Sequence, residues 1–269
     1  MSGKVITWFS IRENSGKTFN AVNCAKRLSD IKGRTILVDL NLRFPRISDM
    51  LLLQDVTHNL DNLFPYASSN NLSTGVIQSN IEEKKGLHVL KGTVTPQQGE
   101  YRTHQDIEGI IGFLKTMYDY IIIDCSSFIN NAGTYVALQE ADEVFMLLHR
   151  DVISCMCFAD VSQTIKGWFN TDKFKFILNM DSNNVNMLES EVEDFIDFKI
   201  EGKIPLLSPG IINDINTGKV IDFLNKQDKE VQEYLQYLDT IIKTHITGNP
   251  SEVFKKRKKK EVFKLPFLR

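Results

Sequence analysis

The stretch that decides the fold reads Val5-Ile-Thr-Trp-Phe-Ser-Ile-Arg-Glu-Asn-Ser-Gly-Lys-Thr18. It begins with a run of β-branched and aromatic residues, which is typical of a buried strand. Ser15-Gly-Lys-Thr18 then lies where the apolar periodicity of a helix starts. Backbone N–H groups at such a helix start attract phosphate, while the lysine reaches the terminal phosphates and the threonine hydroxyl suits Mg²⁺. The stretch therefore predicts a strand over 4–9, a phosphate-binding loop and a helix over 17–31.

A second segment carries the complementary signal. Tyr118-Asp-Tyr-Ile-Ile-Ile-Asp124 is an apolar run that ends in a carboxylate, the group that holds the magnesium shell in nucleotide-hydrolysing folds. Ser15 to Thr18 alone is also compatible with an ordinary helix cap. The two segments together favour a site for a nucleotide with Mg²⁺.

The remaining sequence alternates short β-branched runs with longer helical periodicity. We predict strands over 4–9, 35–39, 87–91, 120–124, 143–148, 174–179 and 202–204. We predict helices over 17–31, 104–117, 130–138, 153–168, 188–197, 218–224 and 228–245, and a polar loop over 67–74. This order is typical of an α/β, Rossmann-like three-layer P-loop NTPase fold, with a mostly parallel twisted sheet of about seven or eight strands covered by helices on both faces. We expect one domain over 1–248 and a tail over 249–269.

These segments resemble the ParA/MinD family of deviant-Walker P-loop ATPases. The family loop reads Lys-Gly-Gly-Val-Gly-Lys-Thr, where this sequence has Arg12-Glu-Asn-Ser-Gly-Lys-Thr18. Thr35-Ile-Leu-Val-Asp-Leu-Asn41 is similar to the second strand with switch I. Asp119-Tyr-Ile-Ile-Ile-Asp-Cys125 is similar to the Walker B strand, after which two prolines often follow in the family and Ser126-Ser127 follow here. Further similar segments are Asn20–Ala25, Phe176–Asn179 and Ile204-Pro205, and Asn213–Val220 resembles the family's loop before the closing helices. The resemblance therefore covers about residues 3–245.

The resemblance implies binding of ATP or ADP with Mg²⁺, and it implies roles for individual residues. The implied catalytic residues are Lys17, Asn41, Asp39 and Arg12. The implied nucleotide-binding residues are Ser15, Gly16, Lys17, Thr18, Phe19, Asn179 and Pro205, and the implied magnesium residues are Thr18, Asp39 and Asp124. Among the branches, the loop and the Asp39-Leu-Asn-Leu-Arg43 switch are most similar to the CpaE/TadZ proteins that position pilus machinery.

The sequence departs from the family pattern in the loop and in switch I. Arg12 replaces a lysine that reaches the partner's phosphates in a dimer that sandwiches ATP, and a planar guanidinium is no simple substitute for lysine. Ile11, Glu13 and Asn14 stand where glycines are usual, so we expect backbone strain, above all at Ile11, and reduced affinity for nucleotide. Asn41 replaces the aspartate that orients the attacking water. Because an amide cannot accept a proton from water, we expect slow hydrolysis.

The end of the chain is strongly basic. Ser251 to Arg269 contains eight basic residues against Glu252 and Glu261, a local charge of +6. Because the whole chain has a net charge of −2, the first 250 residues carry −8. Phe254, Phe263, Leu265, Phe267 and Leu268 lie among these lysines. The mixture favours contact with an anionic membrane. Non-specific binding of nucleic acid and a solvated tail are the alternatives.

Composition excludes several other classes. With 42% hydrophobic and 25% charged residues, the chain is neither disordered nor collagen-like. The longest apolar runs, such as Val144 to Leu148, are far shorter than the roughly 18 residues of a membrane-spanning helix. The amino terminus has no signal-peptide pattern, the four cysteines lack zinc-ligand spacing, and the five histidines are scattered. We therefore expect a cytoplasmic protein with free thiols, compatible with a peripheral position at the inner face of the plasma membrane.

The sequence thus predicts an ATP-binding switch that forms a homodimer around ATP and positions a protein cargo of pilus or secretion machinery at the membrane. A plasmid or chromosome partitioning ATPase that binds DNA non-specifically and a pseudo-ATPase scaffold are the alternatives. Related bacterial tyrosine kinases carry tail tyrosines, whereas no tyrosine follows Tyr237, so we do not expect that branch.

Overall fold

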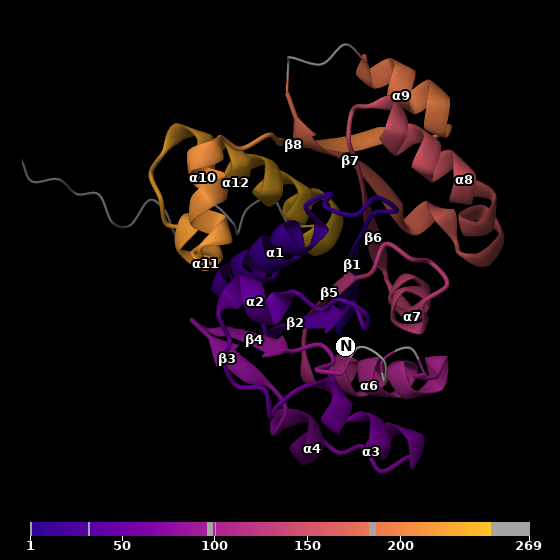
Figure 1. Cartoon of the computed structure of the whole chain (residues 1–269), viewed down its shortest axis with the longest axis vertical. Coiled ribbons are helices and arrows are strands. Elements are labelled where there is room, and N and C mark those ends of the chain that lie inside the picture. The colour runs from indigo at the N-terminus through magenta and orange to yellow at the C-terminus, as the bar shows by residue number, and fades with distance from the viewer. Residues whose placement is uncertain (1, 32, 96–98, 100, 183–186, 249–269) are drawn as a thin grey trace, which may run out of the picture.

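An eight-stranded sheet crosses the middle of the computed structural model, which describes residues 2–31, 33–95, 99, 101–182 and 187–248 (Figure 1). Its strands lie in the order β3-β4-β2-β5-β1-β6-β7-β8. The strands are β1 (Lys4–Phe9), β2 (Thr35–Leu40), β3 (Glu82–Lys84), β4 (Leu87–Leu90), β5 (Tyr120–Cys125), β6 (Glu143–Leu148), β7 (Phe174–Asp181) and β8 (Ile200–Pro205). Every pairing is parallel except that of β3 with β4.

The central strands are buried on both faces, as their continuous apolar sequences require. On β1, the neighbouring residues Val5 and Ile6 point to opposite faces and belong to two different hydrophobic cores. β1 lies between β5 and β6, and β5 also pairs with β2 in a register that sets Asp39 beside Asp124. The sheet therefore brings the ends of β1, β2 and β5 together.

Helices cover the two faces of the sheet (Figure 1). One face carries α3 (Phe64–Ser68), α6 (His104–Met117), α7 (Ala132–Glu140), α8 (Val152–Trp168) and α9 (Glu189–Ile196). The other face carries α1 (Lys17–Ile31), α2 (Ile47–Leu51), α10 (Pro209–Asn216), α11 (Val220–Phe223) and α12 (Lys229–Ile241), which a π-helical turn over Ile242–Thr247 extends. None of the described helices has the length and the apolar content needed to cross a membrane.

The expected α/β fold is confirmed, but several short elements were not predicted. The segment over 67–74 is a loop only in part, because α3 ends at Ser68 and α4 (Thr74–Gln78) begins within it, capped by Ser73. α2 and β3 are too short to show a periodic pattern. The segment over 213–220 is no continuous loop either, because α10 extends to Asn216. The expected tail over 249–269 lies outside the described residues.

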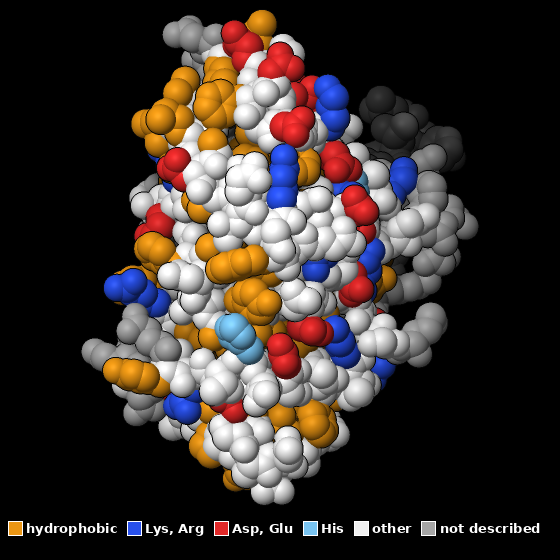
Figure 2. Space-filling view, turned by 90° about the vertical axis from the view of Figure 1, so that its right-hand side faces the viewer, with side chains coloured by type: hydrophobic (Ala, Val, Ile, Leu, Met, Phe, Trp, Pro, Cys, Tyr) orange, Lys and Arg blue, Asp and Glu red, His pale blue; other side chains and the backbone are white. Residues whose placement is uncertain are grey.

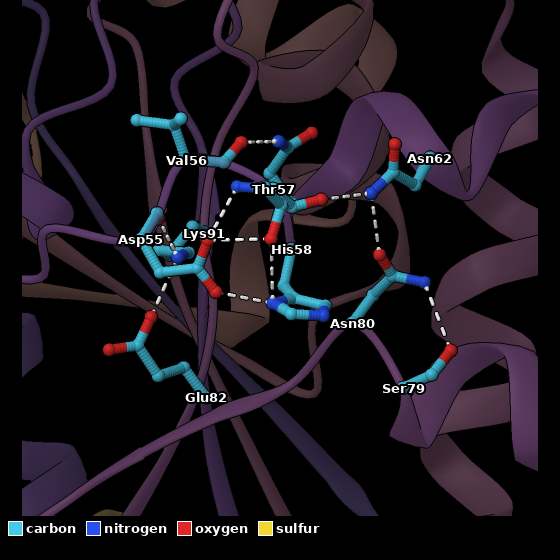
Figure 3. Close-up of polar contacts among 10 residues, drawn as sticks. Asp55, Val56, Thr57, His58, Asn62, Ser79, Asn80, Glu82 and Lys91 are labelled. Carbon is cyan, nitrogen blue, oxygen red and sulfur yellow. Dashed lines mark hydrogen bonds and ion pairs between the residues drawn. The ribbon is translucent and has the colours of Figure 1, made fainter.

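A polar cluster around Asp55, Thr57 and His58 holds the segment after α2 at the edge of the sheet (Figure 3). Asp55 accepts hydrogen bonds from the N–H and hydroxyl of Thr57 and contacts His58 Nδ1. The hydrogen bonds from Thr57, followed by the His58 contact, lower the pKa of Asp55. Buried Lys91, at the end of β4, pairs with Glu82 at 2.6 Å and donates to the backbone oxygen of Asp55. The cluster therefore ties the chain after α2 to β3 and β4.

Candidate nucleotide site

A cavity of about 610 Å³ lies where β1 and β2 end and α1 begins. Its lining includes the loop residues Glu13 to Thr18, and Asn41, Phe44 and Arg46 from the segment after β2. The carboxyl ends of parallel strands are where open α/β sheets bind their ligands, and the volume lies within the usual range for small-molecule sites. The cavity is therefore the candidate site.

The loop itself takes its shape from two residues with positive φ. Asn14 has φ +55° and Gly16 has φ +83°. Asparagine tolerates this conformation better than most residues, and glycine adopts it freely. The strain expected at Ile11 is not found, because Ile11 has no positive φ and packs against the core instead.

Lys17 and Thr18 point toward the end of β5. Lys17 is only 8% exposed, and its Nζ donates to Ser127 Oγ at 2.9 Å. Thr18 Oγ1 donates to Asp124 Oδ2 at 2.7 Å. The two expected halves of the site are thus in contact. Ser127, which stands where the family often has proline, was not assigned a role from the sequence.

Asp39 and Asp124 form a buried acidic pair at the ends of β2 and β5. Burial, and then the charge of Asp124, raise the pKa of Asp39. Burial also raises the pKa of Asp124, against the hydrogen bond from Thr18 and the charge of Lys17. Asp124 Oδ1 and Ser15 Oγ are buried atoms for which the described residues provide no hydrogen-bond partner. An orphaned carboxylate oxygen and hydroxyl beside a lysine fit a bound phosphate with its Mg²⁺.

Asp39 and Asn41 also shape the segment after β2. Asp39 accepts hydrogen bonds from the backbone N–H groups of Asn41, Arg46 and Ile47 at 2.9–3.1 Å. Asn41 Oδ1 accepts from the N–H of Phe44 at 3.1 Å. The structure therefore places Asn41 at the cavity and Asp39 buried next to it, and each one already holds part of the backbone after β2.

Arg12 lies at the other side of the loop, in contact with α8. Its guanidinium pairs with Asp151 Oδ2 at 2.7 Å and lies 3.4 Å from His149 Nδ1. Asp151 also caps α8 by accepting from the N–H of Ser154. Burial, and then the Arg12 charge, lower the pKa of His149. No sequence pattern pointed to Asp151 or His149, because only the fold brings them beside Arg12.

The opposite wall of the cavity is apolar and closes over Phe19. The Phe19 ring lies 5.6 Å from that of Phe223 and 5.3 Å from that of Tyr234. Pro205 at the end of β8 and Ile215 on α10 line the same wall. Phe19 and Pro205, both predicted as nucleotide-binding residues, thus line this wall of the cavity. Asn179 also lines the cavity, but its side-chain amide donates to the backbone oxygen of Ser15 at 2.6 Å.

Solved structures share the fold of this chain. A ParA family ATPase from Chlorobium tepidum superposes with a TM-score of 0.75 at 19% identity, over 89% of this chain and 97% of that chain. A septum site-determining protein MinD from Pyrococcus horikoshii, complexed with Mg-ADP, gives 0.72 at 18% identity, over 90% and 97%. A plasmid partition protein from Borrelia burgdorferi, bound to AMPPNP, gives 0.68 at 18% identity, over 90% and 99%.

Sequence comparison adds a curated relative and a family. The tyrosine-protein kinase CpsD of Streptococcus pneumoniae is 28% identical over 121 residues, which are 45% of this chain. The chain spans about half of that relative, 52% of its length. A family model described as an AAA domain matches residues 3–178, which is more than half of the chain. The chain therefore belongs to this AAA-domain family, and it shares the fold of the ParA and MinD ATPases.

Proposed function

We propose that this protein is an ATP-binding switch that dimerises around ATP, hydrolyses it slowly and positions a protein cargo at a membrane. The observation that carries the proposal is the contact of Lys17 with Ser127 and of Thr18 with Asp124, beside an orphaned oxygen of Asp124. In this proposal Ser15, Gly16 and Lys17 hold the phosphates, and Phe19 and Pro205 bound the adenine. Thr18 and Asp124, with Asp39 beside them, hold the magnesium shell. Bound Mg²⁺ supplies the positive charge that this acidic pair lacks.

Slow hydrolysis follows from the chemistry of switch I. Asn41 stands at the cavity, but a carboxamide cannot accept a proton from an attacking water. Its oxygen is also engaged with the N–H of Phe44. We infer that Asn41 orients water poorly and that the protein remains in its ATP-bound state for long periods.

The surface around the loop supports a second copy of the chain as the dimer partner. Phe44, Phe128, Val152, Ile153 and Met156 are each 45–62% exposed. Arg43 lies over the rings of both Phe44 and Phe128, and the other three begin α8 beside the Arg12–Asp151 pair. Figure 2 shows hydrophobic side chains gathered at the upper left of the face that α6–α9 form. In a dimer, Arg12 would exchange Asp151 for the nucleotide of the partner subunit.

The membrane and the cargo rest on the sequence. The charge of +6 over 251–269, with interleaved aromatic residues, favours an anionic membrane surface. Resemblance to the CpaE/TadZ branch suggests pilus or secretion machinery as the cargo. The similarity to CpsD supports the shared ATPase domain rather than any one branch of the family. DNA partitioning and a scaffold without ATP turnover are the alternatives that the experiments below separate.

Replacing Lys17 with alanine tests the nucleotide site. Lys17→Ala removes the charge that would contact the phosphates, so we expect the Kd for Mg·ATP to rise at least about tenfold, as for a lost charge-assisted hydrogen bond. Titration calorimetry measures the Kd, and circular dichroism checks that the fold is kept. Lys26→Ala is the matched control, because Lys26 lies on the same helix and pairs with Asp30 at its surface. Equal affinity in Lys17→Ala and the unmodified protein would refute the assignment.

Replacing Asn41 with aspartate tests the explanation for slow turnover. Asn41→Asp restores a carboxylate at switch I, and we expect kcat for ATP to rise about tenfold or more, measured by phosphate release under saturating Mg·ATP. Asn216→Asp adds the same charge to the cavity from α10 and should give no gain. An unchanged kcat with unchanged binding would place the defect at Arg12 or Glu13 instead.

Deleting the tail tests the membrane proposal. We expect the full chain to sediment with anionic liposomes at low salt and the chain lacking residues 251–269 to stay in the supernatant. Changing Phe263, Leu265, Phe267 and Leu268 to serine should leave attachment that salt removes, because surface charges are screened within about 8 Å at physiological ionic strength. Retardation of duplex DNA by a chain that ignores such vesicles would favour the partitioning alternative.

A further inference from the structure

Three buried side chains connect the last long helix to the back of the phosphate-binding loop. Tyr234 on α12 donates its hydroxyl to Asn20 Oδ1 at 3.0 Å. Asn20 Nδ2 on α1 donates to the oxygen of Gly16 at 3.0 Å and to Asn179 Oδ1 at 3.3 Å. Asn179 Nδ2 on β7 donates to the oxygen of Ser15 at 2.6 Å. Tyr234 and Asn20 are fully buried, and Asn179 is 3% exposed.

The donor and acceptor of every hydrogen bond in this series are fixed. The backbone oxygens of Ser15 and Gly16 can only accept, so both amide nitrogens must face them. The oxygen of Asn20 then faces the hydroxyl of Tyr234, which donates to it. Neither amide can be turned without pairing like groups in a buried site, which is costly.

Holding these two oxygens sets the orientation of the loop's N–H groups. A peptide unit is planar and trans, so its C=O and N–H point in opposite directions. When the oxygen of Ser15 is held toward β7, the N–H of Gly16 faces the other way. The oxygen of Gly16, held by Asn20, does the same for the N–H of Lys17. These are the N–H groups that cradle phosphate in a loop of this kind.

The contact with Asn179 also explains the residue at position 16. A Cβ added to Gly16 would lie 2.5 Å from Asn179 Nδ2, in addition to the strain of φ +83°. Because residues 13 and 14 are Glu and Asn in place of glycine, the loop has less freedom to adapt its backbone to phosphate. Side chains packed against the loop, such as Asn179, therefore have to hold its backbone in the phosphate-binding conformation before the nucleotide binds.

We propose that Tyr234 and Asn20 are positioning residues for the phosphate-binding loop, acting with Asn179 on the peptide groups of Ser15 and Gly16. The inference rests on the proposed nucleotide function and deepens it. It also gives Asn179 a role at the loop in addition to the nucleotide contact that the family resemblance implies. α12, whose Tyr234 also lines the apolar wall of the cavity, is thereby connected to the phosphate-binding loop as well.

The test compares two variants at the same helix pair. Tyr234→Phe removes only the hydroxyl and keeps the ring that packs 5.3 Å from both Phe19 and Phe223. Asn20 then loses the donor that fixes its amide, and we expect the Kd for Mg·ATP to rise about fivefold, the factor for one hydrogen bond. Asp239→Asn is the matched control, because Asp239 pairs with Arg27 and so also joins α12 to α1, away from the loop. It should lower Tm and leave the Kd within about twofold.

Hydrogen exchange at the loop supplies a readout that helix packing alone would not change. We expect faster exchange at the amides of Gly16 and Lys17 in Tyr234→Phe than in Asp239→Asn. An unchanged Kd in Tyr234→Phe would overturn the inference, as would an equal rise in Asp239→Asn. If the unmodified protein bound no Mg·ATP, the proposed function would fail and the inference with it. If it folds, Asn20→Ala should raise the Kd for Mg·ATP more than Tyr234→Phe does. A smaller rise would contradict the proposed order of the hydrogen bonds, in which Tyr234 acts through Asn20.

Discussion

The site depends on two buried carboxylates whose negative charges need compensating partners. Asp39 and Asp124 lie side by side at the buried ends of β2 and β5, where burial and mutual repulsion oppose their charged forms. Three backbone N–H groups satisfy Asp39, whereas Asp124 has Thr18 on one oxygen and an orphaned second oxygen. Such a pair is stable when a cation shares it. The placement of Lys17 and Thr18 at this point follows from β1 lying next to β5.

The loop that we propose binds phosphate contains one glycine, Gly16, where related loops have several. Only Asn14 and Gly16 take positive φ in this loop, and both residue types accept that conformation. Elsewhere the loop backbone is held by side chains. Asn20 and Asn179 bind the backbone oxygens of Gly16 and Ser15, and Arg12 pairs with Asp151 at the start of α8. The backbone freedom that glycines provide elsewhere is replaced here by fixed side-chain contacts.

Sequence patterns predicted the sheet and its crossover helices because buried strands and amphipathic helices have clear periodicities. They also predicted Lys17, Thr18 and Asp124, which follow directly from the ends of β1 and β5. Ser127, Asp151 and Tyr234 could not be found in this way. Each comes from a distant part of the chain and reaches the loop only through the strand order and the packing of α8 and α12. Two short elements were missed for a simpler reason: α4 is little more than one helical turn, and β3 consists only of the charged residues Glu82, Glu83 and Lys84.

We propose that the bound nucleotide controls the association of this chain. Light scattering after size-exclusion chromatography measures the mass of the protein directly, in Mg²⁺ with ADP or with a non-hydrolysable ATP analogue. With ADP we expect a mass near that of one chain, 30.8 kDa. With the ATP analogue we expect twice that mass, and for Arg12→Ala a single chain under the same conditions. A single-chain mass for the unmodified protein at saturating ATP analogue, with binding shown by calorimetry, would refute ATP-dependent dimerisation.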